Sequence, residues 1–186
     1  MTGAFFILQG QSSYIRAMLI VSSLAGAAEA YRERRPARVL SLLSEEEEAP
    51  AFPGLEEDKR LLLYVDRESC AETISKAARA RAREIIDFVR AWDGKGDILI
   101  HCNRGISRST AAAFIVMCMM EPATGEQALM KRLRAVAPHA DPCPMLITYA
   151  DEILGRDGRM ADAVDDLSPP CGADMAAPLA LIALAS

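Results

Sequence analysis

Short apolar runs alternate with longer, mixed segments along most of the chain. Four of these runs have the length and composition of buried strands, at residues 18–21, 38–43, 60–65 and 97–102. Helical patterns follow the first, third and fourth runs, and an acidic loop follows the second. Since strands that alternate with helices form parallel sheets covered on both faces, the pattern predicts a three-layer α/β fold with a twisted, mainly parallel sheet of about four strands.

The helix that follows the third apolar run shows the clearest periodicity. Ser69 and Glu72 fit a capping box at its start, and the sequence DGKG at 93–96 ends it. Arg81 belongs to the apolar face because its aliphatic stem can lie along the core. That face consists of residues three or four positions apart: Ile74, Ala78, Arg81, Ile85, Phe88 and Trp92.

The part of the chain after residue 106 predicts four more helices. The first, from Ser107 to Met120, is apolar on every side from residue 111 onward and therefore belongs inside the domain. The second helix is capped by Thr124 and Gln127 and carries the apolar stripe Leu129, Leu133 and Val136. The third begins at Asp141 and Pro142 and ends at Gly155. The fourth is short and has the sequence GRMADAVDDL at 158–167.

The two ends of the chain allow more than one interpretation. Residues 17–30 resemble a signal-peptide core, but a single arginine, Arg16, precedes them, and the sheet needs a strand here. We therefore expect a strand followed by a helix from Leu24 to Arg34. Residues 1–167 are expected to form a single domain. The apolar tail at 168–186 is expected either to dock on the body or on a partner, or to be poorly ordered.

Composition limits the classes of partner. The chain has 186 residues and a formal net charge of −5, which argues against general nucleic-acid binding because that needs a broad basic surface. Five irregularly spaced cysteines predict free thiols in a reducing, cytoplasmic compartment. With two histidines and no Cys/His cluster, we expect no metal site and no cofactor. No apolar run is long enough for a membrane helix, and the four glutamates at 45–48 are expected to form a solvated surface.

The sequence HCNRGISRST at 101–110 lies where a strand gives way to a helix. The first amides of a helix lack intrahelical partners, so this turn and the helix dipole can form a cradle for a dianion. Gly105 permits the unusual backbone angle or close approach that such a curl requires. Arg108 at the rim can hold two phosphate oxygens at once. The residues expected to bind phosphate are Asn103, Arg104, Gly105, Ile106, Ser107 and Arg108.

Cys102 is expected to lie at the base of this cradle. A helix N-terminus and nearby cations favour the thiolate form of a cysteine, which is the nucleophilic form. Attack on a bound phosphate ester would give a phosphocysteine intermediate, and water would then release phosphate without any metal. Ser109 can donate a hydrogen bond to the sulfur and stabilise it as the leaving group of the second step.

The pattern HC-x-x-G-x-S-R-S resembles the phosphate-binding loop of the protein tyrosine phosphatase superfamily, whose core is His-Cys-x5-Arg-Ser/Thr. The small size and the Ser before the Arg are similar to the dual-specificity branch, including small bacterial members. The resemblance covers roughly residues 17–155, and it implies Cys102 as nucleophile, Arg108 as phosphate clamp and His101 as a structural neighbour that orients the loop. Many relatives have a small residue where this chain has Arg104. That cation would either favour acidic substrates or pair with a nearby carboxylate.

The same resemblance implies an aspartate that acts as general acid, in a loop that follows a strand upstream of the cysteine. Asp66 fits, because it directly follows the third apolar run and lies 36 positions before Cys102. Asp58 precedes that run, and Glu68 lies closer to the helix cap. We therefore assign the general acid to Asp66.

The function expected from these residues is a cysteine-dependent phosphomonoester hydrolase. Its substrate would be a phosphotyrosine or phosphoserine/threonine protein, or a phosphorylated small molecule such as a phosphoinositide or an inositol phosphate. One alternative is a catalytically silent phosphate-binding module, although the Cys, the Arg and a candidate acid are all present. Another is a rhodanese-like sulfurtransferase, but the Arg-Ser ending of the loop fits phosphate better.

Overall fold

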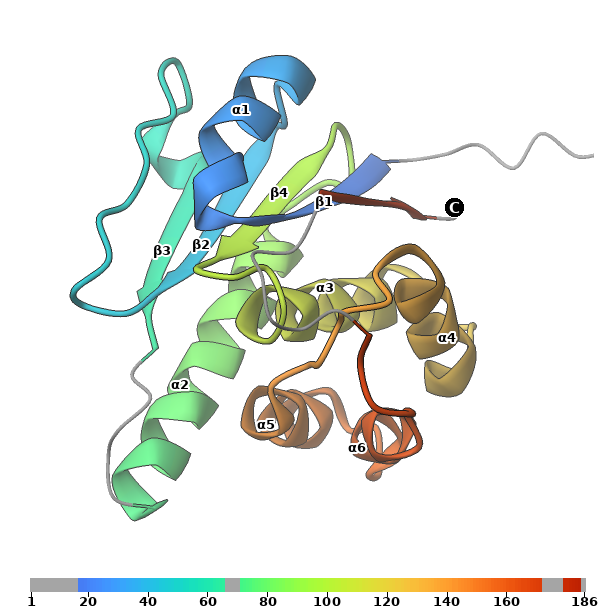
Figure 1. Ribbon diagram of the computed structural model, residues 1–186. Coiled ribbons are helices and arrows are strands. Elements are labelled where there is room, and N and C mark those ends of the chain that lie inside the picture. Colours follow the sequence, from blue (N-terminus) through green and yellow to red (C-terminus); the bar gives the residue numbers. More distant parts are fainter. Residues whose placement is uncertain (1–16, 66–70, 172–178, 185–186) are drawn as a thin grey trace, which may run out of the picture.

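Five strands form one sheet in the computed structural model, which describes residues 17–65, 71–171 and 179–184 (Figure 1). From one edge to the other they are β3 (Arg60–Tyr64), β2 (Arg38–Leu43), β4 (Ile98–Cys102), β1 (Ala17–Ser23) and β5 (Ala180–Leu184). The first four run parallel, whereas β5 runs antiparallel to β1. The α/β class and the mainly parallel sheet are confirmed, with one strand that the sequence did not predict.

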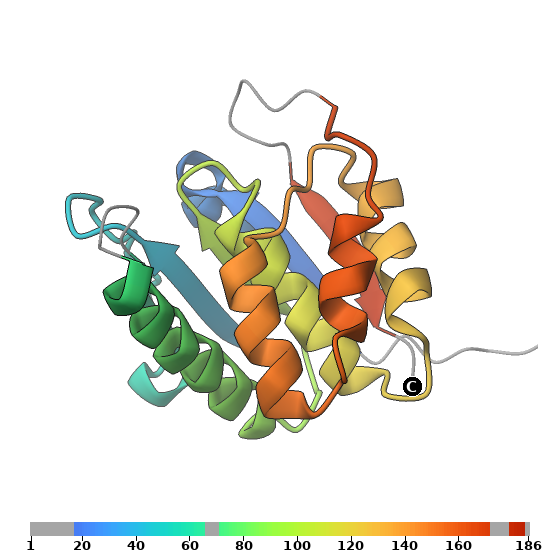
Figure 2. The ribbon, with the colours of Figure 1, turned by 90° about the horizontal axis from the view of Figure 1, so that it is seen from below.

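Helices cover both faces of the sheet. On one face, α1 (Leu24–Arg34) lies over β1 and β4. On the other, α3 (Arg108–Met120) contacts the sheet and α2 (Ala71–Arg90) packs beside it. Of the remaining helices, α4 (Glu126–Val136) packs on α3 and α5 (Pro144–Leu154) packs on both α2 and α3, while α6 (Arg159–Asp165) packs on α4 and α5 (Figure 2). Among the described residues, no helix is long and apolar enough to cross a membrane.

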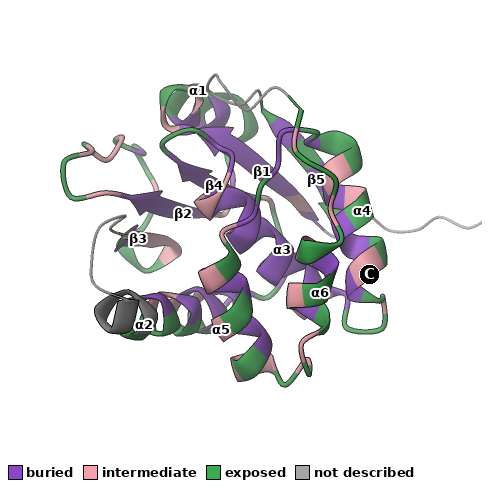
Figure 3. Ribbon diagram, turned by 60° about the horizontal axis from the view of Figure 1, so that its bottom comes forward, coloured by how far each residue is buried: buried purple, intermediate pink, exposed green. Residues whose placement is uncertain are grey.

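The central strands are buried on both faces, which explains their nearly continuous apolar runs (Figure 3). The larger hydrophobic cluster lies between the sheet and the helices α2 and α3. A smaller cluster around Tyr31 and Phe52 lies on the α1 side. As predicted, α3 lies inside the domain: every residue from Ser109 to Cys118 is buried.

The apolar end of the C-terminal tail forms β5. Its side chains alternate between the two faces of the sheet, with Ala180, Ile182 and Leu184 buried and Leu181 exposed. The strand pairs with β1 along its whole length, from Ala17 opposite Leu184 to Val21 opposite Ala180. Residues 180–184 therefore dock on the body and extend the sheet at its edge.

Two helix starts differ from their sequence predictions. The N-cap of α4 is Gly125, and neither Thr124 nor Gln127 supplies a side-chain cap. The N-cap of α5 is Cys143, with a proline in the first turn, and Asp141 lies before the helix, where its backbone N–H donates to the carbonyl of Ile106 at 2.9 Å.

The predicted apolar stripe of α4 is shorter than expected. Leu129 and Leu133 are buried, but Val136 at the end of the helix is 43% exposed. The end predicted for α5 is confirmed, because Gly155 adopts the left-handed conformation as its C-cap.

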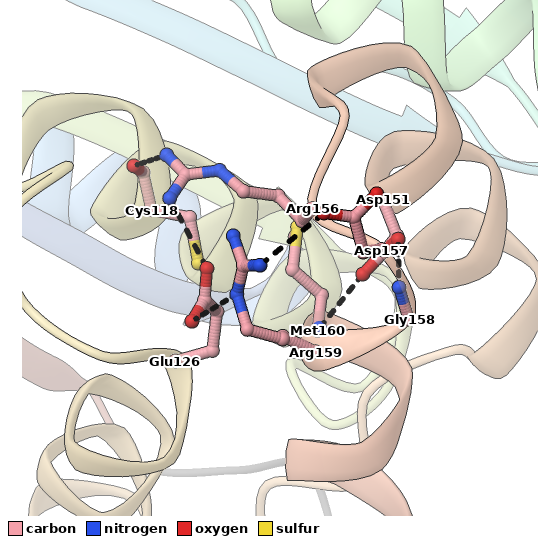
Figure 4. Close-up of polar contacts among 8 residues, drawn as sticks. All are labelled: Cys118, Glu126, Asp151, Arg156, Asp157, Gly158, Arg159 and Met160. Atoms are coloured by element: carbon pink, nitrogen blue, oxygen red, sulfur yellow. Dashed lines mark hydrogen bonds and ion pairs between the residues drawn. The ribbon is translucent and has the colours of Figure 1, made fainter.

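A buried ionic cluster fastens α4, α5 and α6 to the end of α3 (Figure 4). Arg156 donates to the carbonyl of Cys118 at 2.6 Å and to Glu126 at 3.1 Å, and Arg159 donates to Glu126 at 3.3 Å. Asp151 accepts from the backbone N–H groups of Gly158 and Met160, both at 2.7 Å, and so caps α6. Burial alone raises the pKa of Glu126, but its own backbone N–H and the two arginines outweigh burial and lower it.

Removing Arg156 should destabilise the domain strongly. Glu126 has only 6% of its side chain exposed, and Arg156→Met would leave this buried carboxylate with one arginine instead of two and would remove the donor to the Cys118 carbonyl. We expect the free energy of unfolding to fall by about 3 kcal/mol, as for other broken buried ion pairs. Urea denaturation followed by circular dichroism measures it.

The matched control removes an exposed ion pair between α2 and α5. Arg79 and Glu152 are each about half exposed, so Arg79→Met should cost less than about 1 kcal/mol. Equal losses in the two variants would contradict a structural role of the buried cluster.

Candidate active site

The loop from Asn103 to Ser107 joins the end of β4 to the start of α3. Strand β4 lies between β2 and β1, with Cys102 opposite Leu42 on one side and Ser23 on the other. The loop therefore lies at the carboxyl edge of the parallel sheet, where open α/β sheets usually bind their ligands.

Gly105 is required for the curl of this loop. Its φ of 74° lies in the left-handed region, and a Cβ there would lie 2.9 Å from the backbone N of Ser23 and 3.0 Å from the carbonyl carbon of Ser22. No side chain fits without moving the end of β1. The sequence suggested that the curl of the loop requires a glycine, and this close approach to the backbone of β1 is the steric reason.

Carbonyl groups of the loop accept hydrogen bonds from backbone N–H groups outside the loop. Asn103 O accepts from Leu24 N at 3.0 Å, Ile106 O from Asp141 N at 2.9 Å and Ser107 O from Cys143 N at 3.3 Å. In contrast, among the described residues the amides of Ile106, Ser107 and Arg108 have no protein acceptor. Such a set of open amides at the start of a helix can bind an anion.

The sulfur of Cys102 lies at the base of the loop, and the residue is only 2% exposed. The backbone N–H of Gly105 donates to this sulfur at 3.3 Å, and the Ser109 hydroxyl lies 3.2 Å from it. Both contacts can stabilise a thiolate. Ser109 thus occupies the position beside the sulfur that its proposed role requires.

His101 links β4 to β2. The ring is fully buried, and its Nε2 lies 2.7 Å from the hydroxyl of Ser41, while its edge packs against Phe52. Burial lowers the pKa of His101 to about 4, with a further contribution from the cation of Arg60 that Glu47 partly offsets. The ring is therefore neutral at neutral pH, and its hydrogen bond couples β4 to β2 directly beneath the loop.

Arg108 lies against the turn that follows β2. Its Nη1 donates to the Ser44 hydroxyl at 3.2 Å, and its Nη2 lies 3.6 Å from a carboxylate oxygen of Glu47. The same carboxylate accepts from the side-chain amide of Asn103. The side chains of Arg108 and Glu47 are only 13% and 15% exposed, so this ion pair is largely shielded from water.

Glu47 is the exception among the four glutamates that the sequence placed on a solvated surface. Glu45, Glu46 and Glu48 are exposed, but Glu47 folds inward to Arg108 and Asn103. Burial raises the pKa of Glu47, but hydrogen bonds from the Ser44 backbone and Asn103, together with the charge of Arg108, outweigh burial and lower it. Glu47 is therefore a carboxylate at neutral pH.

The remaining predicted residues are placed as follows. Arg104 is exposed on the loop. Asp58 lies in the short 3-10 helix η1 (Glu57–Lys59) before β3, at the amino end of that strand. Since the five residues of β3 span roughly 17 Å, Asp58 is too far from Cys102 to act as its general acid. Asp66 and Glu68, like Ser69 of the predicted capping box, lie outside the described residues.

Sequence reasoning missed three residues at the site: Ser41, Ser44 and Glu47. All three lie on or just after β2, the strand beside β4. The signal that could have found them is positional, because side chains that follow neighbouring parallel strands meet at one edge of the sheet.

The sequence matches no protein-family model and no curated protein. Solved structures do match. The PTP-2 phosphatase of Cydia pomonella superposes with a TM-score of 0.55 at 15% identity, over 72% of this chain and 84% of that one. PTPMT1 in complex with PI(5)P superposes with a TM-score of 0.52 at 14% identity, over 75% and 94% of the two chains.

These likenesses define the class of fold. The chain has the fold of the protein tyrosine and dual-specificity phosphatases, as the resemblance of the loop implied. At such low identity the superpositions show the fold alone, and the chemistry has to be argued from the loop of this chain.

Proposed function

We propose that the protein is a cysteine-dependent phosphomonoester hydrolase that acts on a phosphorylated protein or a small phosphorylated molecule in the cytoplasm. The observation that carries the proposal is the placement of the Cys102 sulfur beneath open amides, within hydrogen-bond distance of Gly105 N and Ser109 Oγ. Amides at a helix N-terminus bind phosphate oxygens, and the dipole of α3 adds positive potential there. The reaction needs no metal or other cofactor.

The chemistry has two steps. The Cys102 thiolate forms a bond to phosphorus while the ester P–O bond breaks, and Asp66 gives a proton to the leaving oxygen. Water then attacks the phosphocysteine, Asp66 takes a proton from this water, and the S–P bond breaks with the sulfur stabilised by Ser109. The loop from Asn103 to Ser107 holds the phosphate oxygens throughout, and His101 supports it from below.

Arg108 is the clamp for two of these oxygens. Its contacts with Ser44 and Glu47 use Nη1 and Nη2, and a guanidinium has five N–H donors. The Nε–H and the remaining Nη hydrogens are therefore available to phosphate. The turn after β2 holds the guanidinium at the rim of the loop.

The test of this function is hydrolysis of a panel in the presence of EDTA. The panel contains phosphotyrosine and phosphoserine peptides, phosphoinositides and inositol phosphates. We expect at least one class to be hydrolysed at an undiminished rate in EDTA. Phosphate binding without turnover of any member would identify a silent binding module instead. Conversion of thiosulfate to thiocyanate would identify a sulfurtransferase.

Asp66→Asn should affect poor leaving groups most. An alkoxide or a tyrosine phenolate needs a proton as it leaves, whereas a nitrophenolate leaves readily without one. General acid catalysis contributes about 10²–10⁴-fold, so turnover of phosphoserine or phosphotyrosine substrates should fall by that factor and that of 4-nitrophenyl phosphate by less. The alkaline fall in rate, which reports a required protonated acid, should also disappear.

The measurement is the rate of phosphocysteine formation against the leaving-group pKa, for wild type and variant. A steeper dependence in Asp66→Asn supports its role. Unchanged slopes for this variant, with the steepening found in Glu68→Gln, would assign the acid to Glu68.

A further inference from the structure

The acidic turn beside the loop is held in a fixed position. Glu47 N donates to Ser44 O at 3.0 Å, and a carboxylate oxygen of Glu47 accepts from Ser44 N at 2.8 Å, so a main-chain bond and a side-chain bond both close the turn. Arg108 binds Ser44 and Glu47, and Asn103 binds Glu47. Surface loops with many charges usually move freely, but this turn is fastened to two residues of the phosphate-binding loop.

This attachment places negative charge beside the phosphate-binding loop. Glu45 and Glu46 form the tip of the turn, Glu48 follows it, and all three side chains are exposed. Among the described residues, the loop and the start of α3 carry two cations, Arg104 and Arg108, and the turn beside them carries four carboxylates at 45–48. The base of the cradle attracts a dianion, while the adjoining rim repels any further negative charge.

We propose that this acidic turn selects phosphopeptides with Lys or Arg beside the phosphorylated residue. The proposal rests on the proposed phosphatase function and names its substrate class. Neighbouring residues of an extended peptide are about 3.3 Å apart along the chain, so their long basic side chains can reach the turn while the phosphate lies in the loop. Substrates that carry several phosphates, or acidic residues beside one phosphate, meet the repulsive rim.

The size of the effect follows from simple electrostatics. Two unit charges about 8 Å apart in water change a binding constant by roughly twofold, and by about fivefold at 4 Å. Three exposed carboxylates acting on two or three flanking charges should therefore give about a tenfold preference at low salt. At 1 M salt the screening length is about 3 Å, and the preference should largely vanish.

The test compares two phosphotyrosine peptides that are identical except for their flanks, one with lysines and one with glutamates. Wild type should show about tenfold higher kcat/KM for the lysine peptide. The variant Glu45→Gln, Glu46→Gln, Glu48→Gln should reduce this ratio to below about threefold. Turnover of 4-nitrophenyl phosphate, which has no flanks, should stay within about twofold because, among the described residues, no hydrogen bond or ion pair joins any of the three to the loop.

A control variant makes the same change in net charge at the opposite edge of the sheet. Glu33 near the end of α1, together with Glu57 and Asp58 of η1, is exposed there. The variant Glu33→Gln, Glu57→Gln, Asp58→Asn should keep the tenfold preference. If it loses as much preference as the first variant, net charge rather than the acidic turn determines selectivity, and the proposal is wrong.

Measurements of peptide binding test the selectivity of the acidic turn independently of the proposed phosphatase function. The same two peptides are titrated into Cys102→Ser, and fluorescence anisotropy gives their dissociation constants. If no phosphate ester is hydrolysed, the enzymatic function fails, and the ratio of these constants still decides whether the turn selects basic flanks. Equal affinities, or vesicles with PI(5)P turned over better than the lysine peptide, would overturn the proposal.

Discussion

A Cys102→Ser variant is expected to lose phosphatase turnover by about 10³-fold or more while it still folds and binds phosphate. A serine hydroxyl is a far weaker nucleophile than a thiolate at neutral pH, and loss of a covalent nucleophile typically has effects of this size or greater. Serine is close in size to cysteine and fits the buried position beside Gly105 and Ser109. Steady-state kinetics and calorimetric titration with inorganic phosphate measure the two properties.

The matched control is a second buried cysteine. Burial raises the pKa of Cys118 to about 12, so this residue is a protonated thiol at neutral pH and no nucleophile. Cys118→Ala should keep turnover within about threefold. Near-normal hydrolysis by Cys102→Ser, with contaminating phosphatase excluded, would contradict the covalent mechanism.

Arg108→Lys should lower turnover by about 10²–10³-fold, the usual cost of removing one oriented donor from an anion site. Lysine keeps the charge but has no planar fork. A single ammonium cannot contact Ser44 and Glu47 and also hold two phosphate oxygens, as the guanidinium can. The affinity for phosphate should fall as well. Kinetics with one phosphopeptide and phosphate titration of the same samples test both effects.

The control for Arg108 is the other arginine of the loop. Arg104 is exposed, and its replacement by Ala should have a milder effect that differs from one substrate to another. If Arg108→Lys has the same turnover as wild type, the proposal that Arg108 holds two phosphate oxygens is wrong. An equal loss on every substrate for Arg104→Ala would mean that Arg104 supports the loop rather than contacting the substrate.

The sequence predicted those parts of the fold that depend on local signals. The runs that form β2 and β4 are apolar because these central parallel strands are buried on both faces, and this property is visible without knowing their neighbours. The loop from Cys102 to Arg108 is equally local. Its glycine, cysteine and arginine lie within seven residues, so their spacing alone indicates an anion site.

Contacts between distant segments could not be predicted in this way. β5 was missed because its alternating pattern lies in an apolar tail, where only the partner strand β1 distinguishes a strand from a disordered end. Glu47 was assigned to solvent because a charge run is usually exposed, and its partner Arg108 lies 61 positions away. The cluster around Glu126 is equally non-local, since it joins α4, α5 and α6 to the end of α3.

The phosphocysteine intermediate is the most direct test of the central claim. Wild-type protein is mixed with a phosphotyrosine peptide, quenched in acid within the first turnover and digested with a protease, and the peptides are analysed by mass spectrometry. The account predicts one added phosphoryl group on the peptide that contains Cys102, which appears before free phosphate and is absent in Cys102→Ser. Release of phosphate without this adduct, or an adduct on another residue, would contradict it.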